Sequence, residues 1–201
     1  VPRVFELLDE PLADPSLIPT SLLSRFTRGT VTVALGGDGG DELFFGYPTF
    51  AAFTLARFYR RMPRSLRRRV IAPLVSAIPP SFGDLAWDFR VKKFIQGADL
   101  PPLVQNQVWL GAFAPAELEN LAPGLRSSKS APSIFESTLR LAERVRGALP
   151  LAALDYLYFK QYLADQVLVK VDRASMMHAL EVRAPFLDVD LVEFVSRLPP
   201  R

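Results

Sequence analysis

The sequence contains no cysteine and only one histidine, His178, among its 201 residues. The absence of cysteine excludes disulfide bonds, thiolate metal sites and a cysteine nucleophile, and it is compatible with a reducing cytoplasm. A single histidine excludes a metal site built from several histidines, and a Ser-His-Asp triad would have to use His178. No run of about 18 apolar residues occurs, so no transmembrane helix is expected. We therefore expect a cytoplasmic protein that does not insert into a membrane.

The net charge of the chain is only +3, but much of its positive charge is concentrated in one stretch. The run consists of Arg57, Arg60, Arg61, Arg64, Arg67, Arg68 and Arg69. Such a run can bind nucleic acid or a membrane surface, or it can form the solvated face of amphipathic helices. Apolar residues lie between the arginines and no known nucleic-acid motif is present, which favours amphipathic helices. We therefore expect no nucleic-acid or membrane partner.

The pattern of apolar residues predicts a mostly helical chain. A first helix begins with Asp14 as N-cap and Pro15 at its first position, and it ends at Gly29. A buried parallel strand is expected at Val31–Leu35, because it is short and rich in β-branched residues. The segment from Pro123 to Pro132 is expected to be a mobile loop. Further helices are expected over 48–60, 64–77, 84–96, 102–112, 132–147, 151–168, 170–180 and 187–197.

One strand cannot form a sheet by itself, so we expect the partners of Val31–Leu35 to come from residues outside this chain. The N-terminus lacks a methionine and the layout of a signal peptide, which also suggests a piece of a longer protein. The expected fold class is α/β, mostly helical here, with one or few parallel strands.

The loop after Leu35 reads Gly-Gly-Asp-Gly-Gly-Asp-Glu, residues 36–42, and is the most informative stretch. Ligands gather at the carboxyl ends of strands in α/β sheets, and glycines let a ligand approach the backbone closely. Asp38, Asp41 and Glu42 would repel a bare polyphosphate, whereas Mg²⁺ can bridge carboxylates and phosphate oxygens. The alternatives are a simple glycine turn with exposed or capping acids, and a calcium loop, although the EF-hand spacing is absent.

Three blocks of residues resemble the glutamine-hydrolysing asparagine synthetases. Residues 33–47 resemble the signature Ser-Gly-Asp/Glu-Gly-x-Asp-Glu-x-Phe-x-Gly-Tyr of that family. Residues 168–188 resemble a second family block, and residues 9–16 resemble a third that the bacterial branch carries upstream of the glycine loop. The blocks occur in family order and span most of the chain.

The resemblance implies a partial adenine-nucleotide α-hydrolase-like (ATP-pyrophosphatase) domain, of which residues 1–201 are the C-terminal part. The glutaminase domain and the pyrophosphate loop of the family are absent from these residues. The implied reaction uses ATP and Mg²⁺ to convert aspartate to β-aspartyl-AMP, which ammonia from glutamine then converts to asparagine. The alternatives are a paralogue that amidates a sugar, peptide or β-lactam precursor, and a non-catalytic remnant that acts as an interaction module. Whether the protein forms a homodimer is left open.

Carried over by position, the resemblance assigns roles to individual residues. Leu35, Gly36 and Gly37 match positions that bind ATP, the two glycines through their main chain. Asp38 matches the acidic position of the acyl-adenylate step, where a carboxylate can accept a proton or hold ammonia. Asp41 matches an acid near pyrophosphate and Mg²⁺. Glu42 is expected to be a first-turn helix acid that complements the helix dipole.

Two residues depart from the family pattern: Gly36 replaces the usual serine, and Phe45 replaces a second glycine. Charged residues in the second block allow two interpretations. Lys170 or Arg173 can lie beside phosphates or a substrate carboxylate, and Lys170 is our second catalytic candidate after Asp38. For Arg173, Glu181, Arg183 and Asp188 we favour a structural network of ion pairs and caps, because buried charges need partners. His178 is expected to be a packing residue, and Asp172 allows either role.

Overall fold

The computed structural model describes residues 8–10, 12–81, 87–121 and 134–198 of the chain. The contacts divide it into two compact units, which we treat separately. The sheet unit comprises Val1–Gly46 and Leu154–Arg201, and the helical unit comprises Tyr47–Ala153. The loop expected from Pro123 to Pro132 lies outside the described residues. The described chain is mostly helical with one parallel two-stranded sheet, which is consistent with part of an α/β protein.

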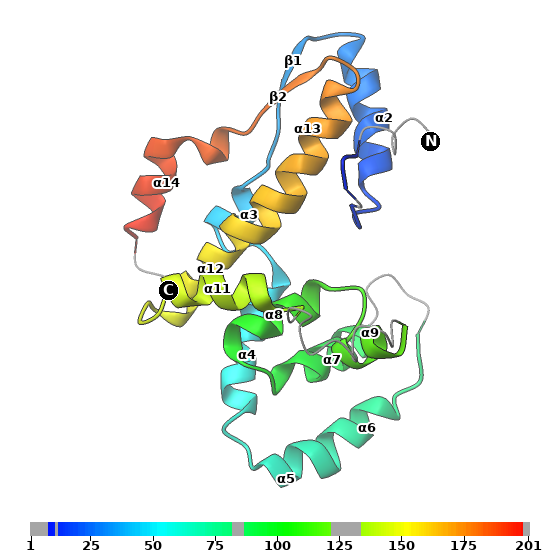
Figure 1. Ribbon diagram of the computed structural model, residues 1–201, viewed down its shortest axis with the longest axis vertical. Helices are drawn as coiled ribbons and strands as arrows, with labels where there is room; N and C mark the ends of the chain where they lie inside the picture. Colours follow the sequence, from blue (N-terminus) through cyan, green and yellow to red (C-terminus); the bar gives the residue numbers. More distant parts are fainter. Residues whose placement is uncertain (1–7, 11, 82–86, 122–133, 199–201) are drawn as a thin grey trace. The chain divides into compact units, whose positions relative to one another are not determined.

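The sheet consists of β1 (Val33–Leu35) and β2 (Glu181–Arg183), which run parallel and side by side (Figure 1). Val33 pairs with Glu181, and Leu35 pairs with Arg183. One main-chain hydrogen bond extends the ladder at each end: Glu181 N–H donates to Thr32 O at 3.0 Å, and Gly36 N–H donates to Arg183 O at 2.8 Å.

The expectation that every partner of the first strand lies outside this chain was therefore wrong. The partner strand β2 was missed because it has only three residues, with exposed charged side chains at both ends and no apolar run. The helix predicted over 170–180 corresponds to α13, which spans Leu168–Met176 and so ends earlier than predicted. Ala179 then adopts a φ of 55°, which turns the chain into β2.

Helix α2 (Leu17–Arg28) packs against α13 in the sheet unit. Its buried residues Leu17, Ser21 and Ser24 recur at helical spacing and form one face. The predicted start of this helix was displaced by two residues: Ser16 is the N-cap, and the Asp14 carboxylate accepts hydrogen bonds from the Ser16 N–H at 2.9 Å and hydroxyl at 2.6 Å. Gly29 follows the last helical residue, as expected.

A continuous helical segment leads into α13. It begins with α12 (Pro150–Leu157) and continues through a π-helix, η2 (Tyr158–Val167). The short helix α3 (Gly40–Leu43) contacts η2, the 3₁₀-helix η3 (Pro185–Leu187) and α14 (Val189–Ser196). The elements after each strand therefore pack together within the sheet unit.

Most of the remaining predicted helices are present in the helical unit. Its core includes the buried residues Phe53, Ala56, Ala98, Val104 and Val108. None of the helices in the described ranges combines the length and hydrophobicity that crossing a membrane requires. The elements are α4 (Pro48–Tyr59), α5 (Arg64–Leu66), η1 (Arg67–Ile71), α6 (Ala72–Ser76), α7 (Trp87–Ala98), α8 (Pro102–Leu110), α9 (Pro115–Leu121) and α11 (Glu136–Arg144).

Part of the arginine run serves the packing of the helical unit. The buried Arg67 forms an ion pair with Asp99, and its guanidinium lies over the Tyr59 ring, 5.3 Å from the centroid. Arg60 donates to the carbonyl of Leu100 at 3.2 Å. Arg67 is therefore a packing residue, whereas the run was expected to form a solvated helix face.

We predict that Gly39→Ala lowers the free energy of unfolding by about 1–3 kcal/mol. Gly39 has a φ of 87°, which L-residues rarely adopt, and an added Cβ would clash with a methyl carbon of Leu187. Chemical unfolding measures the effect. The matched control is Gly37→Ala, where nothing lies within 4 Å of an added Cβ, and it should change stability by less than about 1 kcal/mol. Equal effects of the two variants would contradict the prediction.

Candidate functional site

A pocket of about 220 Å³ lies where β1 and β2 meet α13. Asp38, which follows β1 in the glycine loop, is half-buried and lines it. Asp172 on α13 and Glu181 on β2 also line the pocket, whereas no lysine, arginine or histidine among the described residues does. The remaining lining residues are Leu168, Val171, Ser175, Met176, Val182 and Ala184. The pocket is therefore acidic and favours a positively charged group or a metal ion.

Gly36 lies directly against the Asp38 carboxylate. An added Cβ at Gly36 would lie 2.6 Å from Asp38 Oδ2 and 3.2 Å from Val182 Cγ1, so a side chain there would displace the carboxylate. The N–H of Gly36 donates to Arg183 O, which removes it as a donor to a ligand. Gly37 is exposed and has open space around its Cα, and Leu35 is 74% exposed. Of the two glycines predicted to bind the nucleotide, Gly37 has the more open surroundings.

Asp41 occupies a different position from Asp38. It lies in the first turn of α3, is exposed, and does not line the pocket. Its carboxylate lies over Gly46, where an added Cβ would clash with Oδ1, and the Gly46 N–H donates to Asp41 O at 2.8 Å. Within the described ranges, no cluster of three or more carboxylate, histidine or cysteine residues could hold a metal ion. Mg²⁺ requires fewer, since one or two carboxylates with phosphate and water complete its shell.

Lys170, the second catalytic candidate, forms an ion pair with Asp14 at 3.1 Å, and both side chains are only 15% exposed. Burial alone would raise the pKa of Asp14, but hydrogen bonds from Ser16 and Lys170 outweigh it and lower that pKa. Lys170 does not line the pocket that contains Asp38. The structure therefore joins two of the predicted sequence blocks through Lys170 without bringing it to Asp38.

The remaining charges of the second block form ion pairs and a helix cap, but their side chains are exposed and not buried as the expectation assumed. Arg173 forms an ion pair with Asp9, and Arg183 with Glu181 at 2.7 Å. The Asp188 carboxylate accepts hydrogen bonds from the N–H groups of Asp190 and Leu191 at the start of α14. His178 contacts the Ser21 hydroxyl at 3.0 Å, which agrees with a packing role.

Glu42, the last residue of the glycine loop, is buried and interacts electrostatically with the partly buried Asp155, which was not predicted. Glu42 lies in the first turn of α3, as expected, but it is only 1% exposed, because α3 packs against η2 and α14. Burial, and secondarily the charge of Glu42, raise the pKa of Asp155 to about 7. Burial and then the charges of Asp14, Glu42 and Asp41 also raise the pKa of Tyr162. A proton is therefore held next to the loop near neutral pH.

We predict that Asp155→Asn stabilises the protein more at pH 8 than at pH 5, by roughly 1–2 kcal/mol. The unfolded carboxyl titrates near its ordinary pKa of 3.8, and the folded one at about 7. Between these values only the folded state keeps the proton, so this carboxyl makes the free energy of unfolding fall as pH rises from 3.8 to 7 and leaves it unchanged above 7. Asparagine does not titrate, so the Asp155→Asn variant does not lose this part of the free energy of unfolding as pH rises. Unfolding titrations at pH 5 and pH 8 measure the effect.

The matched control is Asp165→Asn, on the exposed side of η2. It should show the same stability difference from the wild type at both pH values. A pH-independent effect of Asp155→Asn would show that no proton is held at this carboxyl.

Comparison with known proteins relates the whole chain to one protein family. A family model described as Asparagine synthase matches residues 1–201. A protein of Mycobacterium tuberculosis named "Putative asparagine synthetase [glutamine-hydrolyzing]" is 31% identical over 99% of this chain and 29% of its own length. "Asparagine synthetase [glutamine-hydrolyzing] 1" of Bacillus subtilis is 24% identical over 99% of this chain and 30% of its own length.

A third similar protein comes from Methanocaldococcus jannaschii and is named "Putative asparagine synthetase [glutamine-hydrolyzing] 2". It is 32% identical over 90% of this chain and 32% of its own length. The chain thus spans less than a third of the length of these relatives. No solved structure matches the chain significantly.

Proposed function

Because the chain belongs to the asparagine synthase family, we propose that it forms part of the ATP-using half of a glutamine-dependent asparagine synthetase. In the proposed reaction, the side-chain carboxylate of aspartate attacks ATP to give β-aspartyl-AMP and pyrophosphate. Ammonia derived from glutamine then attacks the acyl carbon, and AMP leaves as asparagine forms. The observation that carries the proposal is the half-buried carboxylate of Asp38 in an acidic pocket at the carboxyl end of β1.

We also propose that residues 1–201 are the C-terminal part of an ATP-pyrophosphatase domain, and that further segments cover the sheet unit. Two strands of three residues form a marginal sheet without neighbours. Large apolar side chains on α2 and around β1 are exposed, which favours burial against other parts of the domain. These residues are Leu22, Leu23, Phe26, Val31, Val33 and Leu35. The glutaminase domain and the pyrophosphate loop would belong to such segments.

Asp38 has the surroundings that the second step requires. Ammonia gains positive charge as its nitrogen attacks the acyl carbon, and a carboxylate can hold that nitrogen and accept its proton. Asp172 lines the same pocket, as does Glu181 in its ion pair with Arg183, so Asp38 and Asp172 make the local potential favourable to a cationic nitrogen. Gly36 leaves the space that the Asp38 carboxylate occupies. We propose Asp38 as the catalytic carboxylate of this step.

ATP and Mg²⁺ fit the donors that the loop offers. Gly37 presents an accessible backbone to phosphate oxygens, with Leu35 and Gly36 beside it at the end of β1. Asp41 has an exposed carboxylate of the kind that Mg²⁺ prefers, and we propose that it holds the ion. The bound ion would neutralise charge on pyrophosphate as it leaves. In this proposal Lys170 has a structural role. Its ion pair with Asp14 positions α13, which carries Asp172.

We predict that Asp38→Asn in the full-length enzyme lowers aspartate-dependent asparagine formation by about 10²–10⁴-fold. Asparagine keeps the size of the side chain but cannot accept the proton from the attacking nitrogen. Amino-acid analysis of asparagine measures the product, and pyrophosphate release under the same conditions measures the first step. Circular dichroism checks the fold. The control Asp165→Asn, exposed on η2, should retain full turnover. Near-wild-type turnover of Asp38→Asn would rule out the assigned role.

We predict that Lys170→Met and Asp14→Asn have coupled effects. If the ion pair positions α13, each single variant should lose about 1–3 kcal/mol of stability and about tenfold in turnover, and the double variant should lose little more. Lys170→Arg should recover most of the turnover, because it can keep the ion pair. Unfolding and kinetic measurements on the four proteins of the cycle test this. A loss of turnover in Lys170→Met that far exceeds the loss in Asp14→Asn would instead make Lys170 a catalytic residue.

A further inference from the structure

The helical unit contains a cavity of about 690 Å³ that the proposed reaction does not use. Its walls come from α4, from the segment that includes η1 and α6, and from α7 and α8, all within this unit. Cavities that hold small molecules in proteins commonly have about 300–1,000 Å³. The volume is therefore in the range of a ligand site.

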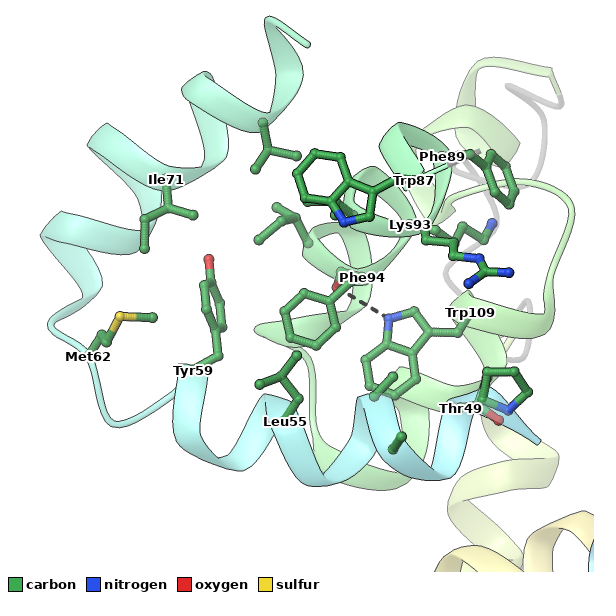
Figure 2. Close-up of a pocket in the computed structure, with 17 residues that line it drawn as sticks. Thr49, Leu55, Tyr59, Met62, Ile71, Trp87, Phe89, Lys93, Phe94 and Trp109 are labelled. Atoms are coloured by element: carbon green, nitrogen blue, oxygen red, sulfur yellow. Dashed lines mark hydrogen bonds between the residues drawn. The ribbon is translucent and has the colours of Figure 1, made fainter. Parts of the chain in front are cut away.

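Aromatic side chains form one wall of this cavity (Figure 2). The rings of Phe94 and Trp109 are stacked with centroids 5.9 Å apart, and Tyr59 meets Phe94 edge-on at 5.6 Å. Trp109 Nε1 donates to the carbonyl of Phe94 at 3.2 Å, a bond that Figure 2 draws across the wall. Because these rings support one another, this wall is already formed without a ligand.

Other apolar residues of the cavity remain exposed to water. Trp87 is 69% exposed, and Leu55 and Phe89 are each more than half exposed. Clustered apolar side chains of this kind are typical of binding sites. The cavity therefore favours a ligand with an apolar body.

The charges of the cavity favour an anionic ligand. Its described lining residues include Arg90 and Lys93 but no aspartate or glutamate. Lys93 donates to the carbonyl of Gly111 at 2.6 Å, whereas Arg90 is exposed and forms no ion pair with any residue that the structure describes. The nearby Asp88 carboxylate is occupied by hydrogen bonds from Ser81.

The helical unit as a whole strengthens this preference. Its sequence contains fifteen lysine and arginine residues against seven aspartate and glutamate residues, a net charge of +8. The sheet unit has nine against fourteen, a net charge of −5. An anion is therefore attracted to the helical unit, although the chain as a whole is nearly neutral.

We propose that this cavity binds an aliphatic carboxylate of medium to long chain length, with the chain among the aromatic residues and the carboxylate at Arg90. Apolar burial supplies most of the affinity, and a charge-assisted hydrogen bond from the guanidinium fixes the orientation. This site shares no described lining residue with the pocket that contains Asp38, and the inference does not depend on the proposed function.

Isothermal titration calorimetry of the full-length protein with hexanoate, octanoate and decanoate tests the apolar part. Affinity should rise by up to about fourfold per added methylene until the cavity is full. Decanol, which has no charge, should bind roughly tenfold more weakly than decanoate. No measurable binding of decanoate, or an affinity independent of chain length, would overturn the proposal.

Two variants test the location. Ala52→Trp, on the α4 wall, should abolish decanoate binding by filling the cavity, and Arg90→Gln should weaken it roughly tenfold. Because Ala52→Trp can disturb packing, circular dichroism accompanies it, and Arg90→Gln tests the site independently at an exposed residue. The control Arg57→Gln removes an exposed charge from α4 outside the cavity and should bind decanoate as the wild type does.

Two further results would also overturn the proposal. One is binding that Arg57→Gln weakens as much as Arg90→Gln does, because the attraction would then be unspecific. The other is a concentration-dependent dimer, measured by light scattering, that excludes decanoate. In that case a second copy of the chain would cover the apolar cavity.

Discussion

The parallel pairing of β1 with β2 is the constraint on which the candidate site depends. It joins the two sequence segments of the sheet unit in a register of only three residue pairs. Because the strands are parallel, the chain leaves both of them at the same edge. Asp38 after β1 thereby comes to line one pocket with Ala184 just beyond β2, and Glu181 at the amino end of β2 lines the same pocket. A shift of one residue would turn the side chains of β2 to the opposite face.

The charged residues of α13 divide between holding this frame and lining the pocket. Lys170 and Arg173 pair with Asp14 and Asp9, and these ion pairs attach the helix to the segment that leads into α2. Asp172 lies between them in sequence and lines the pocket instead. Successive helical residues point in different directions, so one short charged stretch can serve both purposes.

The sequence was sufficient to predict features that depend on local physics. Apolar spacing located the long helices, and β-branched residues before the glycine loop located β1. Each of these signals is contained within a few turns of chain, so no knowledge of tertiary contacts was needed.

Features created by contacts between distant segments were missed. Glu-Val-Arg at 181–183 carries no strand signal, and it becomes β2 because β1 offers unpaired main-chain groups beside it. The position of Glu42 in the first turn of a helix was predicted, but its burial was not, because α3 is covered by η2 and α14. Asp155, which supplies the raised pKa, lies far from the loop in sequence. The Glu42–Asp155 pair exists only once the chain has folded.

The two departures from the family pattern have different physical consequences. Gly36 is compatible with the site as built, because the Asp38 carboxylate lies where a side chain at position 36 would begin. Phe45 adopts a φ of 56°, a conformation that suits the glycine usual there and that is strained by roughly 1–3 kcal/mol for other residues. Asp41 packs on Gly46, the next residue, so this strained turn also holds the proposed Mg²⁺ ligand. Gly36 therefore makes room for one carboxylate of the loop, whereas Phe45 adds strain beside the other.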